Sequence, residues 1–257
     1  MNVAAIDKIL LHFFHELQSY FTLAGRTFVR IFRRPFYYRE CAIQFDTLGF
    51  SSLFICTLTG LFSGMVMALQ SLIQLKPFAA TSYVGGMVAV TMIKELGPVL
   101  AALMVAGRVG SAITAELGTM VVTEQVDAMR VEGTDIIKRL VVPRLLAMVI
   151  ALPLLTIVTD LVSVFGGYVM ASGYSINPVM YISGLPQFML FQDLIEGVVK
   201  PAVFGVIIAI TACYVGLNTK GGAAGVGAAA KQAVVLSSVL ILVCDFFMAK
   251  IFVVFRG

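Results

Sequence analysis

Residues 123–135 form a short charged segment in an otherwise apolar chain, and its side chains could interact with a partner in water. Its sequence, TEQVDAMRVEGTD, places Glu124, Asp127, Arg130 and Asp135 close together. The hydrocarbon of a bilayer cannot hold so many charges, so this segment must lie in water between two membrane spans. A short polar helix carried by a membrane bundle offers a docking surface to a soluble protein. The segment therefore favours a transporter subunit over an enzyme.

A second group of ionisable residues lies within apolar sequence. Lys94 and Glu95 interrupt one hydrophobic stretch, and Asp160 and Asp245 lie in later ones. An unpaired ion in a membrane costs at least roughly a few kcal/mol, so each should face the bundle interior or a wet cavity. Such charges either form structural ion pairs that fix helix register or line a cavity. The ion-pair interpretation is preferred for Asp160, and both stay open for Glu95, Asp245 and Lys200.

The sequence has no recognisable nucleotide, metal or catalytic motif. The P-loop pattern GxxxxGK[ST] is absent, and Gly225-Val226-Gly227 lacks both a preceding strand and the third glycine of a dinucleotide fingerprint. The cysteines form no CxxC pair and mostly lie in apolar runs, which indicates free thiols; they are Cys41, Cys56, Cys213 and Cys244. We expect no cofactor on this chain, so any ATP would be hydrolysed by another subunit.

The composition is that of a membrane protein. Hydrophobic residues make up 60% of the 257 positions and charged residues only 12%, and the mean hydropathy is +0.98. These values predict an all-α, polytopic fold with five transmembrane helices. The expected spans are 47–75, 83–117, 145–172, 201–217 and 233–255.

The segments between these spans are polar or rich in turn residues. A helix is expected over residues 124–135, on the charged segment. Residues 173–199 are too polar and too broken for a span, and they are long enough to form a small cap. A Gly-rich turn is expected over residues 218–227.

The N-terminal region, residues 1–46, precedes the transmembrane domain of residues 47–257. Apolar residues recur there at three- and four-residue steps, which predicts an amphipathic helix over about residues 5–34. Its other face is too charged to span a membrane, so we expect the helix to lie in the headgroup layer. Packing on another protein is the alternative.

Basic residues predict the orientation of the spans. With five spans, the N-terminal region, the charged segment and the Gly-rich turn fall on one side. That side carries Lys8, Arg26, Arg30, Arg33, Arg34, Arg39, Arg130, Lys138, Arg139, Arg144, Lys220 and Lys231. The opposite side has few basic residues, which are Lys76, Lys200 and Arg256. The N-terminus and the charged segment are therefore expected in the cytoplasm and the C-terminus outside.

Three runs in the second span carry the most specific signal: KELGPVLAAL from Lys94, AGRVGSA from Ala106 and TAELG from Thr114. The signal continues in TEQ from Thr123, Pro143-Arg144, LPLL from Leu152 and residues 222–234. Together these runs are similar to the hallmark sequence of the MlaE (YrbE) permease family, and the resemblance covers nearly the whole chain. The sequence departs from it where many members carry Arg in place of Lys94, and Glu or a Thr pair in place of Ala224 and Ala229-Ala230.

The resemblance implies a homodimeric permease core of an ABC-type system that moves phospholipids and maintains outer-membrane lipid asymmetry. It implies the inner membrane of a Gram-negative bacterium, with a cytoplasmic N-terminus and a periplasmic C-terminus. The implied partners are a cytoplasmic ABC ATPase, a STAS-type regulator, a periplasmic MCE-domain hexamer and phospholipids, and no nucleic acid.

The resemblance also implies two sets of site residues. The coupling set would dock on the ATPase, with a solvated loop as the alternative, and comprises Glu124, Asp127, Ala128, Arg130 and Gly133. The substrate set would line a lipid cavity, with bilayer contact, dimer packing or ion pairing as alternatives, and comprises Met67, Gln74, Leu75, Phe78, Lys94, Glu95, Lys200 and Asp245.

Two other functions fit the sequence. One is an ABC permease for another hydrophobic compound, such as a solvent or a sterol. The other is a membrane scaffold that assembles soluble partners and transports nothing.

Overall fold

The computed structural model describes residues 3–31, 37–174 and 178–256, and the regular elements within them are all helices. Among these residues five helices are long and apolar enough to cross a membrane. They are Tyr38–Phe78, Thr81–Val122, Ile137–Gly173, Phe191–Leu217 and Gly222–Phe255. The prediction of an all-α chain with five membrane-spanning helices is confirmed.

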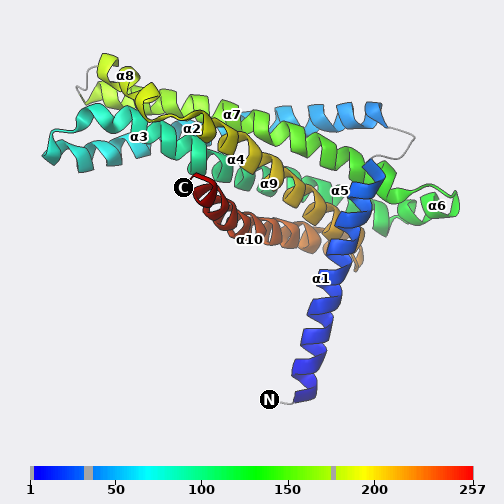
Figure 1. Cartoon of the computed structure of the whole chain (residues 1–257). Coiled ribbons are helices and arrows are strands. Elements are labelled where there is room, and N and C mark those ends of the chain that lie inside the picture. The colour runs from blue at the N-terminus through cyan, green and yellow to red at the C-terminus, as the bar shows by residue number, and fades with distance from the viewer. Residues whose placement is uncertain (1–2, 32–36, 175–177, 257) are drawn as a thin grey trace.

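The spans form one elongated bundle (Figure 1). Helix α2 (Tyr38–Leu75) and helix α7 (Val142–Gly173) pack along most of their length and run toward the same end. The short helix α6 (Gln125–Val131) lies at one end of the bundle, which we call the α6 end. Helix α8 (Pro178–Phe188) lies at the other, the α8 end.

The second span is continuous but contains two wide π-helical turns. Its segments, in chain order, are α3 (Val84–Thr91), η3 (Met92–Leu96), α4 (Gly97–Val105), η4 (Ala106–Gly110) and α5 (Ser111–Val122). The expected interruption at Lys94 and Glu95 is thus a π-turn, η3, rather than a break. Single π-turns inside α-helices are frequent at functional sites.

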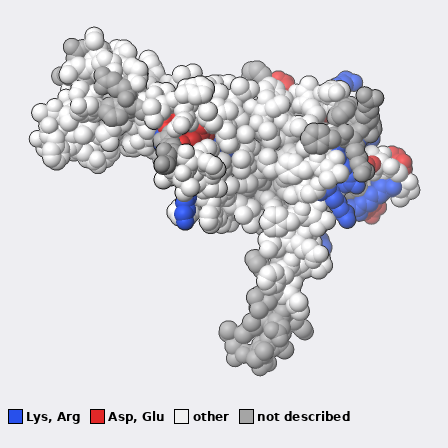
Figure 2. Space-filling view, viewed as in Figure 1, with Lys and Arg blue, Asp and Glu red and all other residues white. Residues whose placement is uncertain are grey.

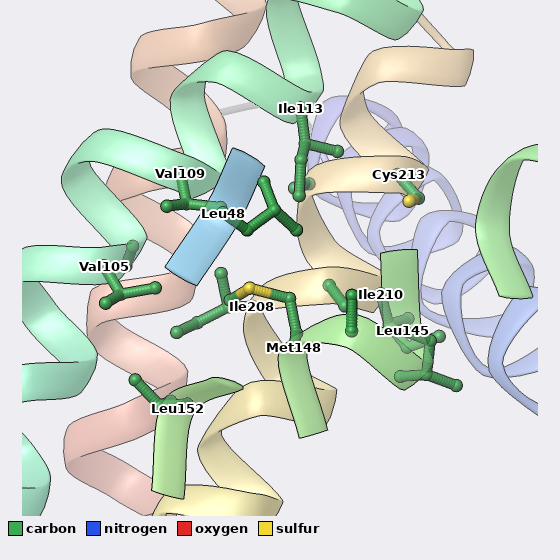
Figure 3. Packing of buried hydrophobic residues seen from close by; sticks show 14 of the residues in the cluster. Leu48, Val105, Val109, Ile113, Leu145, Met148, Leu152, Ile208, Ile210 and Cys213 are labelled. Carbon is green, nitrogen blue, oxygen red and sulfur yellow. The ribbon is translucent and has the colours of Figure 1, made fainter. Parts of the chain in front are cut away.

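The core lies where four spans meet around α9 (Phe191–Leu217). Figure 3 shows its buried side chains, which are Leu48, Val105, Val109, Ile113, Leu145, Met148, Leu152, Ile208, Ile210 and Cys213. A second, smaller cluster lies toward the α8 end and comprises Ala68, Leu72, Val84, Val88, Met92, Ala171 and Tyr181. The last span, α10 (Gly222–Arg256), packs on one side of the bundle and leaves a long apolar face exposed.

Helix α1 (Val3–Ile31) crosses the α6 end of the bundle at a steep angle (Figure 1). The Tyr20 hydroxyl lies 3.1 Å from Thr211 Oγ1 of α9, and the Tyr214 hydroxyl donates to the Glu16 carboxylate. Burial raises the pKa of the Tyr20 phenol, so it stays protonated and available for this hydrogen bond. An apolar stripe on α1 stays exposed and comprises Leu11, Phe14, Leu17, Phe21 and Phe28. The predicted helix end near residue 34 lies outside the described residues.

Several helices begin earlier than the sequence predicts. Helix α2 begins at Tyr38, so the boundary placed between residues 46 and 47 falls inside it. The third span begins at Ile137 instead of 145, and α10 begins at Gly222, inside the expected Gly-rich turn. Hydropathy detects only the part of a helix that suits hydrocarbon, whereas a helix continues into the polar layer wherever its side chains reach water.

The expected loop over residues 173–199 differs most. It contains α8, and α9 already begins at Phe191, so its last part belongs to the fourth span. Asp193 and Glu196, which made this stretch look too polar for a span, are buried within ion pairs. The start of this region, residues 175–177, lies outside the described residues.

Candidate functional site

Six ionisable side chains from three spans meet in the middle of the apolar bundle. We call this group the central ion-pair cluster, and it comprises Lys94, Glu95, Asp193, Glu196, Lys200 and Asp245. The π-turn η3 contributes the first two, α9 the next three and α10 the last. Figure 2 shows an acidic patch near the C-terminal end of α10, with a small basic patch close to it.

Lys200 is at the centre of this cluster, and its side chain is 0% exposed. Its Nζ donates to Glu95 Oε2 at 2.5 Å and lies 3.2 Å from Asp245 Oδ1. It also donates to the Lys94 carbonyl oxygen at 3.0 Å. The ammonium group therefore has three oxygen partners, as many as it has N–H donors.

The third of these partners exists because of a proline. In a regular helix the amide of residue 98 would donate to the Lys94 carbonyl, but Pro98 has no amide hydrogen. The wide turn η3 directly precedes α4, in which Pro98 is at the start. The carbonyl group left free in this way accepts the hydrogen bond from Lys200. The residues from Lys94 to Pro98 thus provide a hydrogen-bond acceptor for the ammonium group of Lys200 on another helix.

The second half of the cluster surrounds the Lys94 side chain. Lys94 Nζ lies 3.4 Å from Asp193 Oδ1 and 3.9 Å from Glu196 Oε2. Asp193 Oδ2 accepts a hydrogen bond of 2.8 Å from the Leu190 amide, which fixes this carboxylate at the start of α9. Both acids are almost fully buried.

The cluster contains more acids than bases. Four carboxylates face two ammonium groups, and Asp245 Oδ1 accepts no hydrogen bond. The Glu95 side chain is 40% exposed, so the cluster opens toward the outside of the protomer. Among the described residues no three His, Cys, Asp or Glu side chains are placed to hold a metal ion. The excess negative charge suits an organic cation or a polar headgroup at this opening.

Close approach of α9 to the π-turn positions the cluster. A Cβ atom at Gly197 would lie 2.9 Å from the Ile93 carbonyl oxygen, too close for any larger residue without a shift of the backbone. We expect Gly197→Ala to separate α9 from η3 and to destabilise the protein by about 1–3 kcal/mol, the usual cost of overpacking. Thermal unfolding in detergent measures this loss.

Gly107→Ala is the matched control, because a Cβ atom there meets nothing within 4 Å. Replacing a helical glycine at an open position should leave stability unchanged or raise it by up to about 1 kcal/mol. Equal unfolding temperatures for the two variants would show that the contact of Gly197 with Ile93 does not constrain the site.

The structure brings together four of the eight substrate residues named from the sequence: Lys94, Glu95, Lys200 and Asp245. The other four lie along the second half of α2. Met67 and Leu75 are half-buried and pack on the core cluster of the α8 end, whereas Gln74 and Phe78 are exposed. Among the described residues no ion pair or hydrogen bond connects these four to the cluster.

The ion pair expected for Asp160 is wrong within the described part of the chain. Asp160 is buried in α7, and its Oδ1 has no hydrogen-bond partner there. It lies against Gly97, where a Cβ atom would come within 1.7 Å of this oxygen. The carboxyl group is therefore packed against the backbone next to η3 rather than against a cation.

The charged segment 123–135 forms a helix over only part of its length, Gln125–Val131. Val126 is buried and Met129 packs on the core, so neither is free to contact a partner. The opposite face carries Glu124, Asp127, Ala128 and Val131, which all lie exposed. Val131, 89% exposed, is thus the one large apolar side chain exposed on this helix.

Gly133 ends helix α6. Its φ of 75° lies in the left-handed region, and the Gly133 amide donates to the Arg130 carbonyl at 3.0 Å. The Thr134 amide donates to the Met129 carbonyl at 2.9 Å, which completes a Schellman motif. The short helix is therefore a rigid projection with a defined end, and residues 132–135 form a turn rather than its last helical turn.

Two ion pairs connect this projection to the rest of the chain. Asp135 Oδ2 lies 2.7 Å from Arg30 Nε of α1. Buried Arg144 of α7 lies 2.7 Å from Glu116 of α5, the helix that leads into α6. The sequence analysis counted Arg144 among the basic residues that predict orientation and in the Pro143-Arg144 pair, but it did not predict the ion pair, because a partner on another helix has no signature in sequence spacing.

Comparison with known proteins gives a consistent result. The family model described as Permease MlaE matches residues 41–251. A probable ABC transporter permease protein of Rickettsia conorii is 40% identical over 253 residues, which cover 98% of each chain. The intermembrane phospholipid transport system permease protein MlaE of Haemophilus influenzae is 32% identical over 97% of this chain and 96% of its own. The chloroplastic protein TRIGALACTOSYLDIACYLGLYCEROL 1 of Arabidopsis thaliana is 36% identical over 91% of this chain and 67% of its own.

Proposed function

Because the chain belongs to the MlaE permease family of ABC transporters, we propose that it is the permease subunit of a phospholipid transport system that maintains outer-membrane lipid asymmetry. The relative from Haemophilus influenzae is named for intermembrane phospholipid transport, which supports this class of substrate. The chain itself binds no cofactor in this proposal, and ATP is hydrolysed by a partner subunit.

The observation that carries the proposal is the central ion-pair cluster. Buried Lys200 is held between Glu95 and Asp245 inside an apolar bundle, and the cluster opens to one side. A phospholipid needs polar anchors for its headgroup beside apolar surface for its acyl chains, and this arrangement offers both. In the proposal Lys94, Glu95 and Asp245 contact the headgroup, and buried Lys200 holds Glu95 and Asp245 in place. Met67, Gln74, Leu75 and Phe78 line the path of the chains.

A second copy of the chain would complete the cavity. Several large apolar side chains along α10 are exposed in the protomer, among them Leu242, Phe246 and Ile251. Asp245 lies on the same helix, so a dimer formed along α10 would place two clusters close to each other. A homodimer is therefore the assembly we propose.

Basic residues support the proposed orientation. Lys and Arg side chains gather around the α6 end (Figure 2), and α2 there begins with Arg39. On the basis of the positive-inside rule we propose that this end, with α1, faces the cytoplasm. The membrane in this proposal is the inner membrane of a Gram-negative bacterium. Helix α1 then lies in the interface plane with its apolar stripe toward the acyl chains.

The outward face of α6 is the proposed contact for a cytoplasmic ABC ATPase. Glu124, Asp127, Ala128, Arg130 and Gly133 form or support this face. A STAS-type regulator would act beside the ATPase, and a periplasmic MCE-domain hexamer would receive or deliver lipid at the α8 end. No nucleic acid has a role in this proposal.

Photo-crosslinking tests the substrate. A photoreactive residue is placed at Met67 or Leu75, both half-buried, and as a control at Leu161, which is exposed on α7. In cells we expect several-fold more phospholipid captured at the first two positions than at the control, because a bound headgroup and tail stay longer than bulk lipid. Mass spectrometry of the adducts measures the capture.

Equal capture at all three positions would show that only the bulk bilayer is sampled. Adducts of a solvent or a sterol instead of phospholipid would identify another hydrophobic substrate. Capture without any transport by the purified complex in vesicles would leave the chain as a scaffold.

A further inference from the structure

A cavity lies at the α6 end of the bundle, and none of the residues that line it belongs to the central ion-pair cluster. Its volume is about 620 Å³, within the ~300–1,000 Å³ of small-molecule sites. Helix α1, the end of α9 and the first part of α10 form its walls. Figure 1 shows α1 crossing the bundle where α9 ends and α10 begins.

The deep part of this cavity is apolar. Leu17 and Phe21 of α1, both partly exposed, form one wall, and Leu236 and Leu240 of α10 form another. Since an α-helix rises 1.5 Å per residue, Leu240 lies roughly 20 Å further along α10 than Gly225, where the cavity begins. The cavity is therefore long and narrow, and it runs from the end of the bundle into its apolar part.

The mouth of the cavity is polar and carries both signs of charge. Glu16, Asn218, Lys220 and Gln232 line it. Glu16 accepts a hydrogen bond from the Tyr214 hydroxyl, which holds its carboxylate at the rim. Lys220 is exposed and forms no salt bridge with any described residue. A positive and a negative group at one mouth complement a zwitterionic molecule.

Small side chains line the cavity between its polar and its apolar part. They are Gly225, Ala228 and Ala229 of α10. The result is a slot that is polar at the end of the bundle and apolar further in. This is the polarity gradient of one bilayer leaflet, from headgroup to acyl chain.

We propose that this cavity binds one zwitterionic phospholipid from the leaflet at the α6 end. Lys220 contacts its phosphate, Glu16 faces its ammonium group, and one acyl chain lies along Leu236 and Leu240. The bound lipid would join α1 to α9 and α10, and α1 is itself ion-paired through Arg30 to Asp135 beyond α6. The proposal does not rest on the transport function, because none of these residues belongs to the central ion-pair cluster.

Neighbouring residues of α10 allow a sharp test. The full-length chain, with a photoreactive residue at Leu236 or at Val235, is reconstituted in vesicles of phosphatidylethanolamine and phosphatidylglycerol. Leu236 faces the cavity, whereas Val235 is 64% exposed and points about 100° away around the helix. We expect phosphatidylethanolamine to be the main adduct at Leu236 and the two lipids to be captured in their bulk ratio at Val235.

Two further variants separate a binding site from bulk lipid. Lys220→Gln removes one cationic contact and should lower capture at Leu236 about fivefold, the effect of one basic residue near a phosphate. Ala228→Phe fills the slot without a change of charge and should lower capture at Leu236 at least as much. Neither variant should change capture at Val235, and the transport activity does not enter the readout.

Two results would overturn the proposal. Capture at Leu236 that matches Val235 in lipid composition and ignores both substitutions would show an open contact with the bilayer. Crosslinking of Leu236 to a second copy of the chain, instead of to lipid, would show that the slot is filled by a protein interface.

Discussion

Replacing Lys200 by methionine is expected to stop phospholipid transport and to lower stability by about 3–5 kcal/mol. Breaking a buried ion pair by removal of one partner has this cost, because the remaining charge stays buried without compensation. Here Glu95 and Asp245 would face each other without the ammonium group that lies 2.5 Å and 3.2 Å from them. Thermal unfolding in detergent and lipid transfer by the complex in vesicles measure the two effects.

Lys250→Met is the control, because Lys250 is exposed on α10, the helix of Asp245. It removes the same charge from the chain and should leave stability and transport at their original levels. The triple variant Lys200→Met, Glu95→Gln and Asp245→Asn removes all three charges together. It should recover much of the lost stability while transport stays absent, which separates the headgroup contact from the fold.

A Lys200→Met protein with unchanged stability and transport would contradict the assigned pairing. Recovery of transport in the triple variant would contradict the role of the charges in binding. In that case the central ion-pair cluster would serve only to fix helix register.

The fold could be predicted from the sequence because the membrane limits the possible structures. A span needs about 20 apolar residues and must be helical to satisfy its backbone, so composition and length alone predict five helices. The same argument identified Lys94, Glu95 and Asp245 as unusual, since an unpaired charge in hydrocarbon is energetically costly. The structure places all three in one cluster.

Asp193 and Glu196 were missed for a physical reason. Hydropathy gives a paired charge the same penalty as an exposed one, so these acids made the start of α9 look like a loop. Their cation, Lys94, lies on a different span, and nothing in local spacing reveals such a pair. One signal was present: Asp193, Glu196 and Lys200 follow at i, i+3 and i+7, which places them on one helical face.

Helix α6 shows a similar limit. Its charge density indicates exposure to water, but it does not tell which face packs on the bundle. Val126 and Met129, three residues apart, both turn toward the core, and this leaves Asp127, Ala128 and Val131 outside. The structure therefore limits the residues of α6 that a partner can contact to those on its outward face.

Exchanging the charges of α6 by the double substitution Asp127→Arg and Arg130→Asp should release the partner ATPase. Asp127 and Arg130 pair with each other at 2.8 Å, and each side chain is 63% exposed. The exchanged pair can form again on the same helix, so α6 stays folded while the charges that it presents are inverted. Like charges placed against each other at a docked interface cost several kcal/mol. We expect recovery of the ATPase with the purified permease to fall about 30-fold, equivalent to about 2 kcal/mol.

The design separates docking from folding. Val131→Asp alters the exposed apolar side chain of the same face and should reduce ATPase recovery independently of the exchanged pair. Lys76→Glu reverses a charge on the exposed C-terminal end of α2, far from α6, and should have no effect on recovery. Unchanged ATPase recovery and unchanged ATP turnover in both α6 variants would show that the segment is a solvated connection between spans. Loss of ATPase in these variants, with an unfolding temperature equal to that of the original chain, would assign the outward face of α6 to the contact through which ATP hydrolysis drives the permease.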